Sequence, residues 1–219
     1  AECQNRRMPK IIGESLASHR ELTRTRLFEA LGSLMGEQSF ESITMSQIAE
    51  RAGVGRTAVY NHFADKEVLL LAYMRQVTEE FTRVLTARLE SEPDPLMRLR
   101  IYIRAHLQMI SRYHLKAGAG LRRQMSGQGA SHLHDHAGVV GELLIGILDE
   151  AMERGLILEQ NTLGAVHLIH ATLQGQRLPQ DPVHRESALL LVETFILRGL
   201  GASEENVRQV TASSLASGE

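Results

Sequence analysis

The segment that decides the fold runs from Ile43 to Leu69 and reads ITMSQIAERAGVGRTAVYNHFADKEVL. It opens with Thr44, which Gln47 follows three residues later, and this spacing is the capping-box pattern of a helix start. The hydroxyl of Thr44 can accept a hydrogen bond from the Gln47 amide, while the Gln47 side chain can reach back to the Thr44 amide. Ile48 and Ala49 then provide an apolar inner face. We therefore expect a helix to begin directly after Thr44.

A second helix follows the first almost at once. Gly53 is suited to the left-handed conformation that ends a helix. Only Val54 and Gly55 separate it from the next helix, which we expect over Arg56–His62. Two short helices joined by a three-residue turn that contains glycine form a helix-turn-helix. We place this motif at residues 44–63 and expect its second helix to read DNA.

Apolar residues at helical spacing predict further helices on both sides of the motif. Before it, the pattern favours a helix from about His19 to Glu37, and after it a long helix from about Lys66 to Glu90. The Pro-Asp-Pro sequence at 93–95 breaks the pattern, because proline cannot continue a helix. Beyond this break we expect five more helices, at Leu96–Tyr113, Gly120–Ser126, Ser131–Arg154, Thr162–Arg177 and His184–Gly199.

The composition agrees with an all-α fold. The chain has 219 residues, of which 43% are hydrophobic, 23% charged and only 4% aromatic. A core rich in leucine and alanine favours helix-on-helix packing over a sandwich or a barrel. We expect four regions: a flexible N-terminal arm at 1–18, a DNA-binding domain at 19–66, a helical domain at 67–202 and a C-terminal tail at 203–219.

The net charge of −2 argues weakly against a nucleic-acid partner, but the charges are unevenly distributed. Residues 1–66 hold nine Lys and Arg against eight Asp and Glu, whereas the remainder is acidic. Between positions 6 and 26, six cations face only Glu14 and Glu21. Either DNA contact or an ordinary solvated helix start explains this basic arm.

Several protein classes have no support in the sequence. The single cysteine, Cys3, rules out an internal disulfide framework and fits a reducing cytosol. No apolar stretch approaches the roughly 18 residues that a membrane-spanning helix needs, and no secretory signal is visible. There is also no glycine-rich phosphate loop, nucleophile elbow or HExxH motif. We therefore expect a cytoplasmic protein that is not an enzyme, needs no cofactor and has no membrane partner.

The helix-turn-helix segment also resembles a known family over about residues 20–72. Three features carry the resemblance: the run from Ala49 to Val54, the run from Tyr60 to Phe63, and the pair Lys66-Glu67. Together they resemble the signature of the TetR (tetracycline repressor) family of transcriptional regulators. The resemblance implies an N-terminal helix-turn-helix DNA-binding domain and a C-terminal helical domain for ligand binding and dimerisation. It further implies a homodimeric repressor that a small-molecule effector releases from a pseudo-palindromic operator.

The resemblance assigns DNA contacts to ten residues. One group would face the major groove or its walls, namely Arg56, Thr57, Ala58, Asn61 and His62. A second group would hold phosphates, namely Thr44, Tyr60 and Lys66, with Ser46 and Gln47 at the same helix start. For Tyr60 and His62 the alternative is packing inside a helical core. The recognition helix begins after Gly55, which caps a helix without supplying a hydroxyl.

A dimer interface is expected near the C-terminus. The segments 188–192 and 195–197 would make a helix that is apolar nearly all round, as in a helix buried between subunits. Together with the helix at Thr162–Arg177 it could build a four-helix interface, although a helix buried in a monomer core would show the same pattern. A two-fold dimer predicts operator half-sites roughly 34–36 Å apart.

In such a family the C-terminal domain would also hold an effector. We expect an apolar pocket between the helices that start at Lys66, Leu96, Ser131 and Thr162. The candidate apolar lining residues are Leu107, Ile110, Val140, Leu144 and Leu173, and the candidate polar handles are His106, His170 and Gln174.

Histidines raise a second possibility for the effector. His132, His134 and His136 are close in sequence, and His167 and His170 share one helix face. Such pairs can ligate zinc or copper, so a metal-responsive repressor is the alternative. No glutamate or cysteine set completes a site by spacing alone, and solvated histidines at a helix start explain the run equally well.

Overall fold

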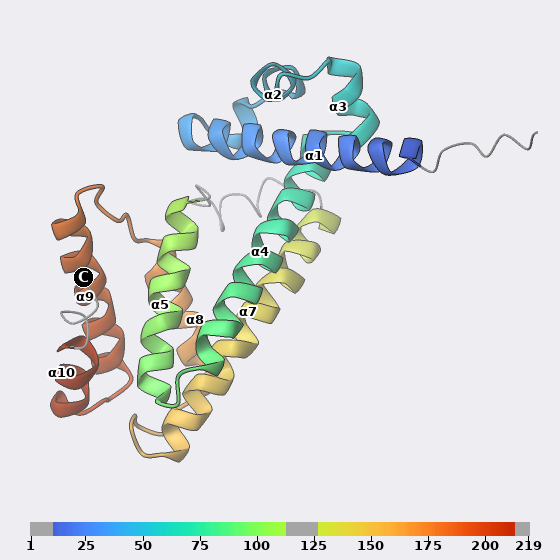
Figure 1. Ribbon diagram of the computed structural model, residues 1–219. Helices are drawn as coiled ribbons and strands as arrows, with labels where there is room; N and C mark the ends of the chain where they lie inside the picture. Colours follow the sequence, from blue (N-terminus) through green and yellow to red (C-terminus); the bar gives the residue numbers. More distant parts are fainter. Residues whose placement is uncertain (1–10, 113–126, 213–219) are drawn as a thin grey trace, which may run out of the picture. The chain divides into compact units, whose positions relative to one another are not determined.

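The computed structural model describes residues 11–112 and 127–212; for 11–17, 112 and 127–139 it describes the helical backbone without the side chains. Within these ranges all regular structure is helical, so the expected all-α fold is confirmed (Figure 1). The chain divides into two compact units, Ala1–Tyr73 and Met74–Glu219. Helix α4 (Lys66–Glu90) begins in the first unit and ends in the second.

The first unit holds the helix-turn-helix. It consists of α1 (Ile11–Glu37), the short 3-10 helix η1 (Phe40–Ser42), α2 (Met45–Ala52), α3 (Arg56–His62) and the start of α4. Thr44 caps α2 with the full capping box, and Gly53 ends α2 in the left-handed conformation, at φ 64°. The expected motif at residues 44–63 is therefore confirmed, with its local signals acting as the sequence predicts.

The core of the first unit fixes the orientation of α3. Val59 of α3 and Ile48 of α2 are fully buried, as are Leu27 and Leu31 of α1. The ring of Phe63, directly after α3, lies 5.8 Å from the ring of Phe28. One side of α3 is thus fixed against α1 and α2, so its other side stays available.

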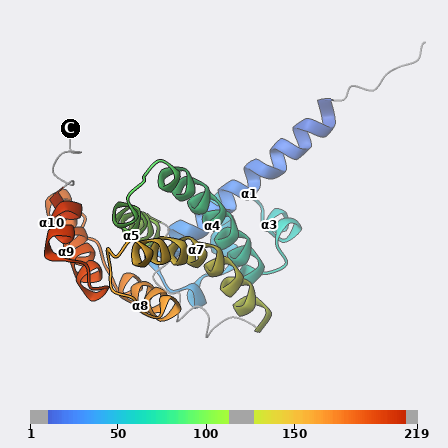
Figure 2. The ribbon, with the colours of Figure 1, turned by 90° about the horizontal axis from the view of Figure 1, so that it is seen from below.

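The second unit is a helical bundle. It contains α5 (Pro95–Arg112), α7 (Gly127–Glu153), α8 (Thr162–Gln174), α9 (Pro182–Gly199) and α10 (Glu204–Ala212). Figures 1 and 2 show α5, α7 and α8 side by side, with α9 and α10 together at one edge. Side-chain oxygens cap the starts of four helices: Asp94 for α5, Asn161 for α8, Asp181 for α9 and Ser203 for α10. The bundle core includes Leu99, Tyr102, Ile103, Leu107, Leu144 and Leu173.

Two expectations differ from the observed elements, and a third cannot be compared with them. Helix α1 begins at Ile11 and not near His19, because residues 11–18 favour helix even though they lack a steady apolar face. Residues 204–212 form α10 where a fraying tail was expected, because Val207 and Val210 are buried in the second unit's core. The short helix expected at 120–126 lies outside the described residues.

Candidate functional site

The exposed face of α3 gathers four polar side chains. Arg56, Thr57, Tyr60 and Asn61 are all exposed, and Tyr60 keeps 52% of its surface accessible. Their spacing of one and four residues puts them on one side of the helix, opposite the fully buried Val59. The structure therefore brings these four residues together on a single surface, and it places Tyr60 outside the core.

The other two expected groove residues lie at the edge of this surface. Ala58 and His62 are half-buried, and the imidazole of His62 lies 6.2 Å from the ring of Phe63. Partial burial and the nearby guanidiniums of Arg20 and Arg24 lower the pKa of His62. His62 is thus a neutral side chain at the junction of α3 with α1.

At the start of α2 the polar side chains bind each other. The amide of Thr44 donates to Oε1 of Gln47 over 2.8 Å, and the Gln47 amide donates to Oγ1 of Thr44 over 3.3 Å. The Thr44 hydroxyl also donates to Oε1 of Gln47, over 3.0 Å. Ser46 is half-buried in the same turn. Thr44 and Gln47 therefore position the first turn of α2.

The ammonium of Lys66, an expected phosphate contact, is engaged within the chain. Its Nζ donates to the carbonyl oxygens of Phe40, Glu41 and Ile43 over 3.1, 2.8 and 3.0 Å, and it lies 4.9 Å from the centre of the Phe40 ring. An ammonium has three donors, so all of them are used within the chain. The physical reason is the 3-10 turn at 40–42, whose last carbonyl oxygens keep lone pairs that a helix would use; that of Phe40 also accepts from the Ile43 amide.

Helix α1 supplies cations that the sequence analysis did not assign to a site. Arg20 and Arg24 are close enough to His62 to lower its pKa. The guanidinium of Arg24 stacks 5.2 Å from the centre of the Phe28 ring, and its buried Nε has no hydrogen-bond partner in the described structure. The sequence does contain a pattern that could have revealed this group: Arg20, Arg24 and Phe28 are four residues apart and share one face of α1.

In the second unit, most of the expected effector-lining residues form closed core. Leu107, Leu144 and Leu173 are at most 1% exposed, and Ile110 and Val140 are also buried. Gln174 is exposed at the end of α8. These apolar side chains point into the interfaces between helices and fill them, so the expected set does not line an open cavity.

The two expected histidine handles do lie together. The ring of His106 stacks on the rings of Tyr102 and His170, at centre distances of 5.7 and 5.4 Å. The Tyr102 hydroxyl is 2.6 Å from Nε2 of His170. Burial, reinforced by His170, lowers the pKa of His106 to about 3. His106 is therefore neutral, and its buried Nδ1 has no partner in the described structure, which is a costly arrangement.

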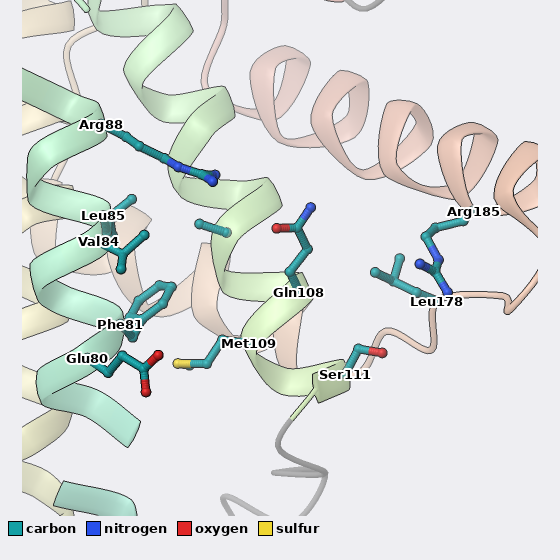
Figure 3. A pocket seen from close by; sticks show the side chains of 11 residues that line it. Glu80, Phe81, Val84, Leu85, Arg88, Gln108, Met109, Ser111, Leu178 and Arg185 are labelled. Carbon is teal, nitrogen blue, oxygen red and sulfur yellow. The ribbon is translucent and has the colours of Figure 1, made fainter. Parts of the chain in front are cut away.

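A cavity of about 440 Å³ lies next to this stack, between α4, α5 and the segment that leads into α9 (Figure 3). None of the expected lining residues borders it. Its walls are formed by Glu80, Phe81, Val84, Leu85, Arg88, Ala105, Gln108, Met109, Ser111, Leu178 and Arg185. Phe81 links the cavity to the stack, because its ring meets His106 edge-on at 6.2 Å.

An uncovered apolar surface runs along α8 and α9. Leu168 of α8 is 72% exposed, and Leu191 and Phe195 of α9 are 70% and 63% exposed. The opposite side of α9, with Val192 and Ile196, is buried in the bundle. Helix α9 is therefore apolar on both sides, as the sequence pattern suggested.

A buried ion-pair network that the sequence pattern did not predict joins α5 to α9. Glu193 is fully buried and accepts hydrogen bonds from Arg100, over 3.1 Å, and from Arg104. Arg104 also binds both carboxylate oxygens of Glu186. The partners are 82 to 93 residues apart in the chain, so no local pattern could have revealed them.

The described part of the chain contains neither a metal-binding cluster nor a membrane-spanning helix. No three His, Cys, Asp or Glu side chains in it come together as a metal-binding group. The side chains of His132, His134 and His136 lie outside the described residues. None of the described helices is long and apolar enough to cross a membrane.

Comparison with known proteins agrees with the geometry of the first unit. Residues 27–73 match the model of the family described as bacterial regulatory proteins, tetR family. An HTH-type transcriptional regulator of Mycobacterium tuberculosis is 30% identical over 94 residues, which is 43% of this chain and 46% of that protein. The chain thus spans about half the length of the curated relatives it matches.

Solved structures resemble the chain over most of its length. The TetR family transcriptional regulator PfmR from Thermus thermophilus superposes with a TM-score of 0.67 at 23% identity, covering 80% of this chain and 98% of that one. AibR, solved in complex with isovaleryl coenzyme A and operator DNA, superposes with a TM-score of 0.68 at 16% identity, covering 79% and 97%. These likenesses extend the shared fold to the second unit.

Proposed function

Because the chain belongs to the tetR family of bacterial regulatory proteins, we propose that it is a homodimeric repressor that a small-molecule effector releases from a pseudo-palindromic operator. The observation that carries the proposal is the exposed polar face of α3, with Arg56, Thr57, Tyr60 and Asn61 held opposite the buried Val59. A rigid helix that presents such side chains is suited to the major groove.

The roles on this surface follow from side-chain chemistry. Arg56 offers a bidentate donor fork that suits guanine or a phosphate, and Asn61 offers the donor and acceptor pair that suits adenine. Thr57 and the hydroxyl of the exposed Tyr60 suit phosphates or base edges. Because Lys66 is used within the chain, Arg20 and Arg24 of α1 are the better candidates for further phosphate contacts.

A second copy of the chain is the proposed partner for the apolar surface on α8 and α9. Exposed Leu168, Leu191 and Phe195 would be costly to leave in water. Paired α8 and α9 helices from two subunits would bury them in a four-helix interface. The two-fold axis of such a dimer requires an operator with two inverted half-sites.

Release by an effector would be a shift in population between two states of the dimer. The effector binds more tightly to the state in which the two recognition helices do not match the half-sites, and it lowers operator affinity by that difference. Two observations favour a small molecule: the second unit has a cavity of about 440 Å³, and AibR, which shares the fold, was solved with a coenzyme A thioester.

The test is selection of genomic fragments by the purified full chain, followed by titration of the selected site at two salt concentrations. We expect a pseudo-palindromic site whose affinity falls steeply as salt rises. Arg56→Ala should weaken binding about tenfold or more and relax the preference at one base position. Arg26→Ala removes the same charge from an exposed position on α1 and should have little effect. Failure to enrich any site would contradict the proposal.

A further inference from the structure

The cavity of the second unit has the dimensions of a small-ligand site. Its volume of about 440 Å³ falls within the roughly 300–1,000 Å³ of typical ligand pockets. Two helices, α4 and α5, form its main walls, and Leu178 and Arg185 close it from the segment that leads into α9 and from α9 itself (Figure 3). Walls made of helices hold a ligand in a more defined position than loops do.

One part of the lining is apolar. Phe81, Val84 and Leu85 of α4 face Met109 of α5 and Leu178 across the cavity (Figure 3). Val84 keeps 41% of its surface exposed, so this wall offers apolar area that a ligand could cover. Covering apolar surface favours binding in proportion to the area removed from water.

The other part of the lining is cationic. Arg88 lies three residues, just under one turn, beyond Leu85 on α4 and near Gln108 of α5, and Arg185 lies on the far side (Figure 3). The guanidinium of Arg185 donates to the carbonyls of Pro179 and Gln180, which fixes its charge at the rim. The Arg88 side chain makes no hydrogen bond or ion pair with any residue that the structure describes. It is therefore the cation available to an incoming anion.

Among the described residues that line the cavity, the one carboxylate, that of Glu80, is at the other end. Glu80 and Arg88 are both on α4, eight residues apart, which corresponds to about 12 Å along the helix. A ligand whose anionic group lies at Arg88 would therefore keep that group away from Glu80 while its apolar part covers Phe81 and Val84.

We propose that this cavity binds an amphipathic organic anion, with its apolar body against the Phe81–Leu85 wall and its anionic group on Arg88 beside Gln108. The regulatory meaning of the site rests on the proposed function, in which this anion is the effector. The binding itself does not depend on DNA.

Helix α5 connects the cavity to α8 and α9, so a bound ligand can affect the surface of these two helices. Phe81 touches His106, which stacks on His170 of α8. Ala105 of the cavity wall is next to Arg104, which binds Glu186 and Glu193 of α9. A ligand that shifts Phe81 or α5 therefore acts on both helices of the proposed dimer interface, and a close-packed core transmits such shifts.

The test uses two fluorescent probes with the same aromatic body. One is 1-anilinonaphthalene-8-sulfonate, an amphipathic anion, and the other is N-phenyl-1-naphthylamine, which lacks the sulfonate. Each is titrated into the full-length protein. We expect the anion to bind more tightly, and Arg88→Gln to weaken its affinity about tenfold while leaving the neutral probe unchanged. The control Arg83→Gln, at an exposed position on α4 outside the lining, should leave the affinities for both probes unchanged.

A second variant locates the probes. Ala105→Trp fills the cavity, so both probes should lose most of their affinity, while circular dichroism checks that the variant stays helical. Equal affinity of the wild-type protein for the two probes, no effect of Arg88→Gln, or unchanged binding to Ala105→Trp would each overturn the inference. Operator binding is measured separately: if the anion binds as described but leaves operator affinity unchanged, the site stands and release by an effector fails.

Discussion

Replacement of Lys66 by methionine separates a structural role from a DNA-binding role at this position. Lys66→Met keeps most of the side-chain stem and removes the ammonium, together with its three hydrogen bonds to the carbonyls of Phe40, Glu41 and Ile43. A hydrogen bond to a charged group contributes about 1.5–3 kcal/mol, but water can partly replace the lysine at these half-exposed carbonyls. The cation–π contact with Phe40 adds about 0.5 kcal/mol. We therefore expect the free energy of unfolding to fall by about 2–3 kcal/mol in total.

The assay is urea unfolding followed by circular dichroism, with Arg26→Met as the matched control. A loss of about 2–3 kcal/mol moves the midpoint by about 1–1.5 M urea if the denaturant slope is near 2 kcal/mol per molar. The control removes an exposed cation from the same unit and should cost less than about 0.5 kcal/mol. Amide hydrogen exchange at Ser42 and Ile43 should also speed up in Lys66→Met, because the 3-10 turn loses its tie to α4.

If Lys66 instead contacts a DNA phosphate, titrations of the operator at several salt concentrations will show it. A lysine that holds a phosphate contributes about one to the slope of log affinity against log salt. An unfolding curve identical to wild type, combined with a salt slope reduced by about one, would refute the structural role.

Three further predictions concern the cap, the dimer and pH. Thr44→Ala removes the hydroxyl of the capping box and should lower the free energy of unfolding by about 1 kcal/mol; an unchanged urea midpoint would show that the cap contributes nothing. Leu191→Arg with Phe195→Arg should convert the proposed dimer to monomers in sedimentation analysis, whereas Leu22→Arg, at an exposed leucine of α1, should leave the assembly intact; a dimer that survives the first pair would place the interface elsewhere. Burial lowers the pKa of His106 from 6.5 to about 3, so the unfolded chain takes up a proton below pH 6.5 that the folded chain does not. The free energy of unfolding therefore decreases as the pH is lowered, by up to about 1.4 kcal/mol per pH unit between about pH 6 and pH 3. His106→Phe keeps a stacked ring and should reduce the stability difference between pH 7.0 and 5.5, with His62 and His170 supplying the remaining dependence; an undiminished difference would show that His106 does not titrate on unfolding.

Short-range interactions explain which features could be predicted from the sequence. The capping box of Thr44 and Gln47 and the left-handed Gly53 depend only on residues three or four positions apart, so the pattern alone predicts the helix-turn-helix. The exposed side of α3 follows in the same way once Val59 is identified as the buried position. For α9, the apolar pattern predicted two covered sides, one of which the folded chain buries while the other stays exposed.

Long-range packing decided the rest. Lys66 reaches carbonyls 23 to 26 residues away, and Glu193 meets arginines that are 89 and 93 residues away, so neither role leaves a trace in local spacing. The cavity is the clearest case: on α5, Ala105 borders it whereas the adjacent His106 and Leu107 are buried, a difference set by the rotation of one helix against its neighbours. Sequence periodicity defines which face of a helix is apolar, but only the tertiary structure decides where apolar faces meet completely and where they leave space for a ligand.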